Sequence, residues 1–291
     1  MNRCVFLVFA LFGPICLLGQ SDFTLHGVIK DSLGVELPYA ILSLRPSDRT
    51  MYSESDGRFA FTGVSINDTL EVQALGYKST KVGVKDASPL LIEMDAVSYF
   101  LEEISVVEKR TDSFYELSLG DFAKKCRAQV RNSPGAIIVR HIKNPQGAPG
   151  YLISVRFWAD LLKNCPGLVR IRVYEVDSDD GPGKELTRTN QLISLKPSKK
   201  IHRIDISEQA ILLPKRGAYV GIEFVKQNDE CKSDKVSGSR HIGIGLNHKT
   251  SASQTYSSRL AIRWGTVSMG IPDKPDRVAN LNLDVQVRYP N

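Results

Sequence analysis

The stretch that decides the fold is SESDGRFAF, residues 53–61. Phe59 and Phe61 lie two residues apart, which is the period of a strand with one buried face. Asp56 and Gly57 stand just before this strand, and glycine adopts a positive φ at low cost. The stretch therefore predicts a hairpin turn that leads into a strand.

The same pattern extends on both sides of this stretch. Apolar residues alternate with polar ones, or form short runs, in four further segments, at residues 25–29, 40–44, 70–74 and 90–94. Turn signals such as Asn67-Asp68 and Gly76 separate the segments. Many short strands with close turns predict an all-β sandwich over residues 22–107.

The order of motifs in this region also resembles a known family. The motifs are GVIKDSLG at 27–34, LPYA at 37–40, SESDGRF at 53–59, LEVQALGY at 70–77, LLIEM at 90–94 and LEEISVV at 101–107. This order resembles the carboxypeptidase-like regulatory domain, a transthyretin-like (prealbumin-like) seven-stranded sandwich found in exported proteins of the Bacteroidetes type. The resemblance implies a structural or docking module with no catalytic residues of its own.

The N-terminus reads as an export signal. Arg3 precedes an apolar run over residues 5–18, and Gly19 supplies a small residue for cleavage. We therefore expect residues 1–19 to be a signal peptide, with an uncleaved anchor or lipid modification at Cys16 as alternatives. No later run is long and apolar enough for a membrane-spanning helix, so we expect no span after cleavage.

A connector with a short helix is expected between two domains. Residues 108–135 begin with charged side chains and end in Ser-Pro-Gly, and residues 113–131 place Phe122, Ala123, Cys126 and Val130 at spacings of three to four. From residue 136 to 291 the strand pattern returns, most clearly in Leu281, Leu283, Val285 and Val287. This half predicts a jelly-roll-like β-sandwich, and it resembles the uncharacterised sandwich that accompanies the first module.

Charge and motifs argue against several functional classes. The formal net charge is +6, without a dense basic tract, so nucleic acid is not an expected partner. The five histidines do not form a zinc motif, and no Gly-x-Ser-x-Gly elbow occurs. We therefore expect no cofactor and no enzymatic activity.

One strand pair carries the candidate binding residues. Trp158 and Arg156 lie on the polar side of a predicted strand, and an even register with the next strand places Arg170, Arg172 and Tyr174 beside them. An aromatic ring among guanidinium groups is a surface that binds a sugar or a partner protein. Two alternatives remain open: another part of the chain covers Trp158, or the two strands fall in different sheets.

Two further sites are weaker. Asp177, Asp179 and Asp180 cluster before a Pro-Gly turn and are a candidate Ca²⁺ site, although such turns also carry solvated acids. Cys165 and Cys231 lie in loop segments and are the preferred disulfide pair, with free thiols as the alternative.

Together these features predict an exported, non-catalytic protein of the cell envelope, located in the periplasm, at the outer membrane surface or outside the cell. The first sandwich is expected to dock, and the second to bind an envelope protein or a glycan. A carbohydrate-binding accessory protein is one alternative. An exported hydrolase whose site is assembled from distant residues is the other.

Overall fold

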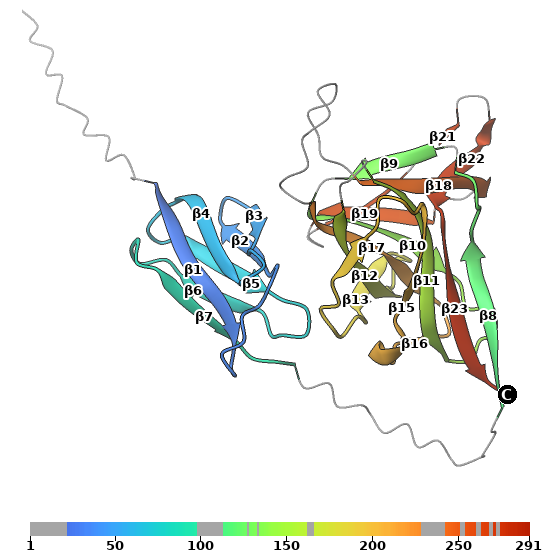
Figure 1. Ribbon diagram of the computed structural model, residues 1–291, viewed down its shortest axis with the longest axis horizontal. Helices are drawn as coiled ribbons and strands as arrows, with labels where there is room; N and C mark the ends of the chain where they lie inside the picture. The colour runs from blue at the N-terminus through green and yellow to red at the C-terminus, as the bar shows by residue number, and fades with distance from the viewer. Residues whose placement is uncertain are drawn as a thin grey trace, which may run out of the picture.

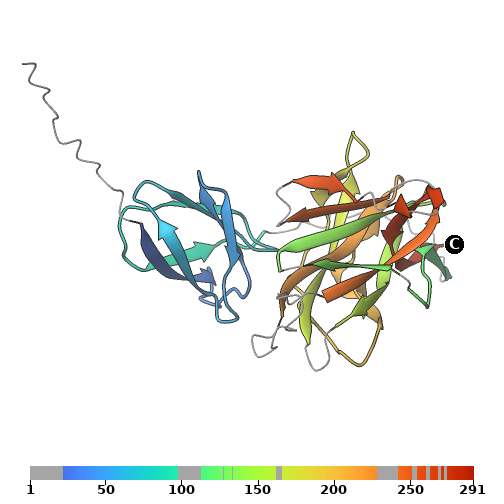
Figure 2. The same ribbon diagram turned by 90° about the horizontal axis from the view of Figure 1, so that it is seen from above.

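The computed structural model describes residues 22–97, 113–126, 128–132, 134–161, 166–227, 242–250, 254–259, 263–267, 270–271 and 274–291. The regular structure of these residues is strands, apart from one short 3-10 turn, Ser207–Gln209. They form two bodies that lie side by side along the long axis of the molecule, with β1 to β7 in one and β8 to β23 in the other (Figures 1 and 2). The predicted all-β class with two sandwiches is confirmed. The predicted signal peptide lies outside the described residues.

The first sandwich consists of two small sheets. One has the order β4-β1-β7, in which β1 and β7 are parallel, and the other has the order β3-β2-β5-β6. The strands are β1 (Phe23–Asp31), β2 (Ile41–Arg45), β3 (Arg49–Tyr52), β4 (Arg58–Val64), β5 (Thr69–Gln73), β6 (Thr80–Gly83) and β7 (Leu90–Met94).

The core of this sandwich comes from the alternating residues. Leu25, Leu42 and Leu70 are fully buried, and Phe59 and Phe61 pack in the same cluster. Burial of such side chains between two sheets contributes about 1.5 to 3 kcal/mol each. The one-sided alternation in the sequence thus predicts the buried face correctly.

The turn before Phe59 differs in one respect from the hairpin expected there. Gly57 has a φ of +72°, so the predicted need for glycine is confirmed. However, β3 pairs with β2 and β4 pairs with β1, so the turn joins strands of two different sheets. The prediction of a hairpin at Asp56-Gly57 is therefore wrong.

The second sandwich pairs a seven-stranded sheet with a nine-stranded one. The first has the order β13-β12-β17-β10-β19-β20, with β14 beside β12. The second has the order β21-β22-β18-β11-β23-β8, with β15 and β16 beside β11 and β9 beside β18. The strands are β8 (Phe114–Asp121), β9 (Ala128–Asn132), β10 (Ala136–Ile142), β11 (Gly150–Asp160), β12 (Gly167–Val176), β13 (Pro182–Glu185), β14 (Ile193–Leu195), β15 (Ile201–Asp205), β16 (Leu212–Leu213), β17 (Ala218–Gln227), β18 (Ile242–Thr250), β19 (Thr255–Arg259), β20 (Trp264–Thr266), β21 (Gly270–Ile271), β22 (Lys274–Leu281) and β23 (Leu283–Pro290).

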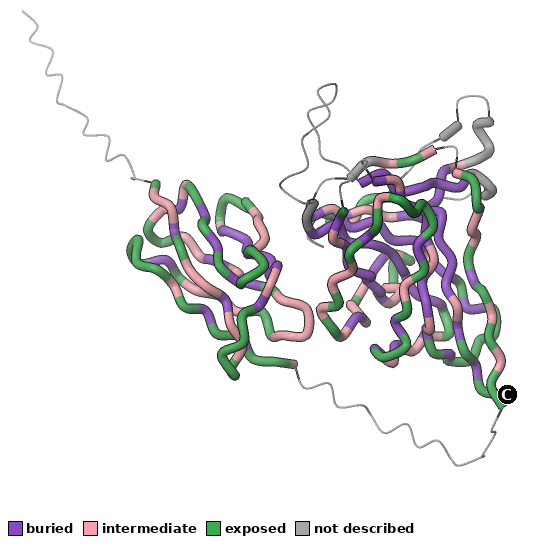
Figure 3. Tube along the Cα trace, viewed as in Figure 1, coloured by how far each residue is buried: buried purple, intermediate pink, exposed green. Residues whose placement is uncertain are grey.

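The main core lies between these two sheets. Val169, Ile171 and Val173 of β12 face Val285 and Val287 of β23 within one large cluster. Buried segments accordingly run along the central strands of the body in Figure 3. The alternation predicted for the last strand is confirmed by its buried valines.

The expected helix at residues 113–131 is wrong. The described residues of this segment form β8, which pairs with β23, and β9, which pairs with β18. The physical reason lies in the first half, where Tyr115, Leu117 and Leu119 alternate with polar residues and pack on the core. The segment belongs to the second sandwich and is not a helical linker. No helix among the described residues has the length and apolar character needed to cross a bilayer.

Candidate functional site

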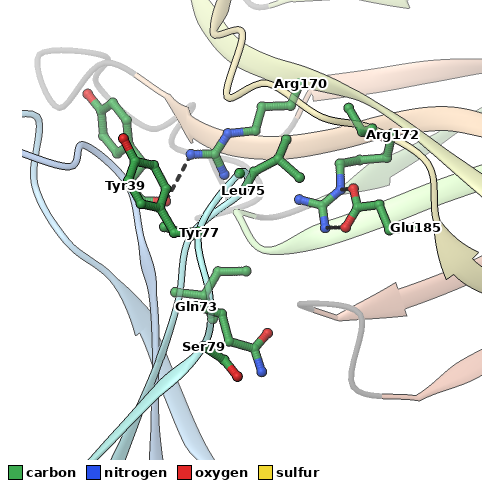
Figure 4. Close-up of a pocket in the computed structure, with 12 residues that line it drawn as sticks. Tyr39, Gln73, Leu75, Tyr77, Ser79, Arg170, Arg172 and Glu185 are labelled. Atoms are coloured by element: carbon green, nitrogen blue, oxygen red, sulfur yellow. Dashed lines mark hydrogen bonds and ion pairs between the residues drawn. The ribbon is translucent and has the colours of Figure 1, made fainter. Parts of the chain in front are cut away.

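A cavity of about 310 Å³ lies where the two sandwiches meet (Figure 4). The first sandwich contributes Tyr39, Gln73, Tyr77 and Ser79, among others. The second contributes Arg170, Arg172, Glu185 and Thr187. Its volume lies at the lower end of the range of small-molecule sites.

The two arginines reach this boundary because of the strand period. On β12 the residues Val169, Ile171 and Val173 face the core, so Arg170 and Arg172 point to the opposite side of the sheet. The first sandwich covers that side, and the two arginines are only 3% and 5% exposed. Charges removed from water in this way need partners.

Glu223 of β17 is the main partner. It lies directly across from Arg170 in the antiparallel register and is fully buried. Arg170 Nη1 donates to its Oε1 at 3.2 Å, and Arg172 Nη1 donates to its Oε2 at 2.7 Å. Tyr52 of the first sandwich donates its hydroxyl to Glu223 Oε1 at 2.6 Å.

Glu185 of β13 completes the charge balance. Its carboxylate lies 2.6 Å from Arg172 Nε, and Arg172 Nη2 donates to its Oε2 at 2.8 Å. Figure 4 shows these two side chains facing each other. Two arginines and two glutamates therefore form a cluster without net charge, which we call the boundary cluster: Arg170, Arg172, Glu185 and Glu223.

The pKa shifts follow from burial and pairing. Burial alone would raise the pKa of Glu223, but Arg172 and Arg170 outweigh it and lower this pKa below its ordinary value. Burial likewise opposes the charge of Arg172, yet Glu223 and other neighbours raise its pKa further. Burial raises the pKa of Glu185 despite Arg172, and it also raises the pKa of Tyr52. Glu223 is thus held as a carboxylate between two guanidinium groups.

Direct hydrogen bonds join the sandwiches beside this cluster. Arg170 Nη2 donates to the carbonyl oxygen of Tyr39 at 2.9 Å. Asn190 Nδ2 donates to the carbonyl oxygen of Pro38 at 3.3 Å. With the bond from Tyr52, three polar contacts fix the cavity walls relative to each other.

The cavity offers the chemistry of a binding site. Tyr39 and Tyr77 contribute aromatic rings, and Gln73 and Ser79 contribute exposed groups that donate and accept hydrogen bonds. The charged side chains in its wall are already neutralised by each other. Such a cavity suits a polar ligand without net charge.

The structure does not bring the predicted binding residues together. Trp158 and Arg156 lie on β11, which belongs to the nine-stranded sheet, whereas Arg170, Arg172 and Tyr174 lie on β12 in the other sheet. The even register between these two strands, on which the prediction rested, does not occur. The five residues therefore form no common surface.

Trp158 and Arg156 are held by local contacts. Trp158 is 7% exposed, and Lys200 Nζ lies 5.5 Å from the centre of its ring. Arg156 is paired with Asp284, with Nε donating to Oδ1 at 2.9 Å, and lies over the ring of Phe122 at 4.4 Å. The low exposure of Trp158 agrees with the alternative in which another part of the chain covers this side chain. Binding of a partner by Trp158 stays a prediction.

The predicted calcium residues lie in a turn after β12. Asp177 Oδ1 accepts the backbone N–H groups of Asp179 and Gly181 at 3.0 and 2.7 Å. Asp180 pairs with Arg216 at 2.6 Å. The described residues contain no group of three or more His, Cys, Asp or Glu side chains suited to a metal ion. The predicted disulfide partners Cys165 and Cys231 lie outside the described residues.

The histidines near polar groups are engaged with the backbone. His141 Nε2 lies 3.2 Å from the carbonyl oxygen of Arg216, and His202 Nε2 lies 3.0 Å from that of Lys199. A ring nitrogen that meets a carbonyl oxygen acts as the donor. Burial also lowers the pKa of both histidines. Neither is placed as the base of a serine or cysteine nucleophile.

Comparison with known proteins gives no family assignment. No protein-family model matches the chain, and no curated protein is significantly similar. A candidate carbohydrate-binding protein from Bacteroides uniformis is similar over 82% of this chain and 99% of its own, at 12% identity and a TM-score of 0.23. A DUF3823 family protein from Parabacteroides merdae is similar over 70% of this chain and 98% of its own, at 11% identity and a TM-score of 0.22. The major pilin subunit of Bacillus cereus is similar over 90% of this chain and 69% of its own, at 8% identity and a TM-score of 0.21. Similarities this low carry no argument about function.

Sequence reasoning missed the residues of the first sandwich that line the cavity, such as Tyr39 and Tyr77, and it also missed three partners of the two arginines or of each other. Glu223 stands on the polar side of its strand, Glu185 follows a Pro-Gly turn, and Tyr52 ends a short strand. The sequence held one signal for these acidic partners, the pair of arginines on the polar side of β12. These two positive charges have no acidic residue on the same face of their own strand. Such a pair calls for acidic residues on a neighbouring strand.

Proposed function

We propose that this chain is an exported, non-catalytic protein of the cell envelope that binds a neutral glycan between its two sandwiches. The observation that carries the proposal is the polar cavity whose charged wall is neutralised internally by the boundary cluster. An uncharged hydroxylated ligand can enter such a cavity without an ionic partner of its own, because the charged side chains of the wall are already paired with each other. Sugars meet this requirement, and their apolar ring faces pack on aromatic side chains.

The roles of the two halves follow from the same features. The first sandwich acts as a docking module of the carboxypeptidase-like regulatory type, which its motif order supports. It also supplies Tyr39 and Tyr77 to the cavity. The second sandwich supplies the charged wall. Export is supported by the apolar run at residues 5–18 behind Arg3.

A binding role is favoured over hydrolysis by the state of the titratable groups. The two acids of the boundary cluster are each held by arginine, so neither is free to act as a general acid or base. The described histidines at positions 141 and 202 contact backbone carbonyl oxygens. The hydrolase alternative stays a prediction, because another cavity, of about 620 Å³ in the first sandwich, is lined by His26 together with Glu36 and Glu54.

The test is calorimetry of the purified mature chain with cellobiose, maltotriose and N,N′-diacetylchitobiose. We expect at least one of these sugars to bind, and Tyr77→Ala to weaken its binding about fivefold, because a stacked ring contributes about 1 kcal/mol. Tyr77 lines the cavity, and its hydroxyl donates to Asp31 of the first sandwich and not to the boundary cluster, so its removal breaks none of the contacts described above for that cluster.

The matched control is Tyr151→Ala on β11, a tyrosine that is 39% exposed and does not line the cavity. Its affinity should equal that of the unmodified chain. Failure of all three sugars to bind, or an equal loss in both variants, would show that this cavity is not a glycan site.

A further inference from the structure

A second cavity, of about 800 Å³, also lies between the sandwiches and has a different charge. Three arginines line it: Arg49 from β3, Arg259 from the end of β19, and Arg263, which stands just before β20. The first comes from one sandwich and the other two from the second. This cavity shares no lining residue with the one described above.

Arg49 is held in a fixed position. Its Nη1 donates to the carbonyl oxygen of Thr62 at 2.8 Å, and its Nη2 donates to that of Gly63. Its guanidinium lies 5.5 Å from the centre of the Phe61 ring. A Cβ at position 63 would lie 2.9 Å from Arg49 Nη1, so the glycine makes room for the guanidinium.

The positive charge of this cavity is not balanced by its own lining. Asp48 is its only acidic lining residue among those described, and the carboxylate of Asp48 is paired with Arg45. Within the described part of the chain, Arg259 and Arg263 have no ion pair with an acidic side chain. Three like charges around one space repel each other, and an anion in that space relieves the repulsion.

The rest of the lining is largely apolar. Met51 and Ala60 contribute apolar surface next to the arginines, whereas Phe61 is only 5% exposed and lies under the guanidinium of Arg49. A free oxyanion would leave this surface without a partner. A pyranose with an acidic substituent meets both parts, because its ring packs on the apolar residues while its carboxylate or sulfate meets the guanidinium groups.

We propose that this cavity, lined by Arg49, Arg259 and Arg263, is a binding site for an acidic sugar residue of the uronate or sulfated type. Arginine suits this role because its planar fork can donate two parallel hydrogen bonds to a carboxylate. The site is separate from the neutral cavity and stands independently of the function proposed for it.

The test is titration of the mature chain with methyl β-glucuronide, with methyl β-glucoside and inorganic sulfate as comparison ligands. We expect the glucuronide to bind, the glucoside to bind at least about tenfold more weakly, and added salt to weaken glucuronide binding. Binding of sulfate as tight as that of the glucuronide would identify a simple oxyanion site and overturn the sugar assignment.

Two exposed arginines allow variants that keep the fold. Arg259→Gln and Arg263→Gln should each weaken glucuronide binding about tenfold, because each removes one guanidinium group from the lining of the cavity. Lys215→Gln, at an exposed lysine outside this cavity, makes the same change in net charge and should have no effect. An equal effect of all three variants would mean that only net charge matters, which contradicts the proposal.

Two further measurements distinguish this site from the neutral cavity and from a lipid-headgroup site. Tyr77→Ala should leave glucuronide binding unchanged, so failure of the neutral-glycan site and failure of this site are distinguishable. Vesicles containing phosphatidylglycerol should not compete with the glucuronide. Competition by such vesicles, together with loss of vesicle binding in the Arg259→Gln variant, would assign the cavity to an anionic lipid headgroup and overturn the proposal.

Discussion

Glu223 is the residue on which the contact between the sandwiches depends most. It accepts hydrogen bonds from two arginines of its own sandwich and from Tyr52 of the other. A buried ion pair adds little net stability, because desolvation of the charges offsets their attraction. Removal of one partner is costly, because the remaining charge stays buried. The boundary cluster therefore fixes the position of the two sandwiches more than it adds to their stability.

Substitution of Glu223 tests this directly. Glu223→Gln keeps the shape of the side chain but leaves Arg170 without an acidic partner, so we expect a loss of about 3 to 5 kcal/mol in the free energy of unfolding. The measurement is urea unfolding followed by the fluorescence of Trp158 and Trp264, both of which lie in the second sandwich.

Tyr52→Phe is the comparison variant. It removes one hydrogen bond to a carboxylate and no charge, so the expected loss is about 1.5 to 3 kcal/mol, less than that for Glu223→Gln. Equal losses in the two variants would mean that the charge of Glu223 is not what the cluster requires.

At the scale of strands, the sequence predicts burial well where alternation is one-sided. In β23 the apolar residues Leu283, Val285 and Val287 are buried, as their period of two requires. In β12 the same period separates valines that face the core from arginines that face the first sandwich. Alternation cannot predict whether the second face of a strand meets water or another sheet. The residues of that face are polar in sequence in either case.

The segment at residues 113–131 shows how two periods can compete. Phe122, Ala123, Cys126 and Val130 have helical spacing, whereas Tyr115, Leu117 and Leu119 alternate. The strand forms in place of the helix because β8 pairs with the edge of β23 along its whole length in an antiparallel ladder. Gly120 allows the end of this strand to bend, with a φ of +101°. Weighting the alternation over the sparser helical set would have predicted the strand.

The pairing of β10 with β17 depends on a glycine. A Cβ at Gly221 would lie 1.9 Å from the carbonyl oxygen of Ile138, which is backbone and cannot move away without disturbing the ladder. We expect Gly221→Ala to destabilise the second sandwich by about 1 to 3 kcal/mol, measured by thermal unfolding.

Gly265→Ala on β20 is the matched control, since nothing lies within 4 Å of the Cβ it adds. Its effect should stay within about 0.5 kcal/mol. A neutral result for Gly221→Ala would contradict the close approach of the two strands.

At the scale of the molecule, the candidate sites arise where the sandwiches meet. Each cavity is lined by residues of both sandwiches. The neutral cavity has Tyr39 from the first and Thr187 from the second, and the basic cavity has Arg49 from the first and Arg263 from the second. The sequence predicts both sandwiches, because local alternation determines them. It predicts neither cavity, because these depend on how two separate cores pack against each other.

The predicted site residues divide between the two sheets of the second sandwich. Arg170 and Arg172 reach the boundary through their place on β12, and the hydroxyl of Tyr174 accepts a hydrogen bond from Arg172 Nε at 3.1 Å. Trp158 and Arg156 lie on β11 in the other sheet. Strand alternation thus identifies which side chains leave the core, but the sheet to which each strand belongs depends on long-range pairing.

Polar contacts of Tyr52, Arg170 and Asn190 join the two sandwiches, so we expect the two to tumble together as one body. Amide nitrogen spin relaxation tests this expectation most directly, because the relaxation rates report how fast each part of the molecule rotates on the nanosecond timescale. We expect one rotational correlation time for the amides of β1–β7 and those of β10–β23, and two separate values in the Glu223→Gln variant. Two different and shorter correlation times in the unmodified chain would contradict this expectation.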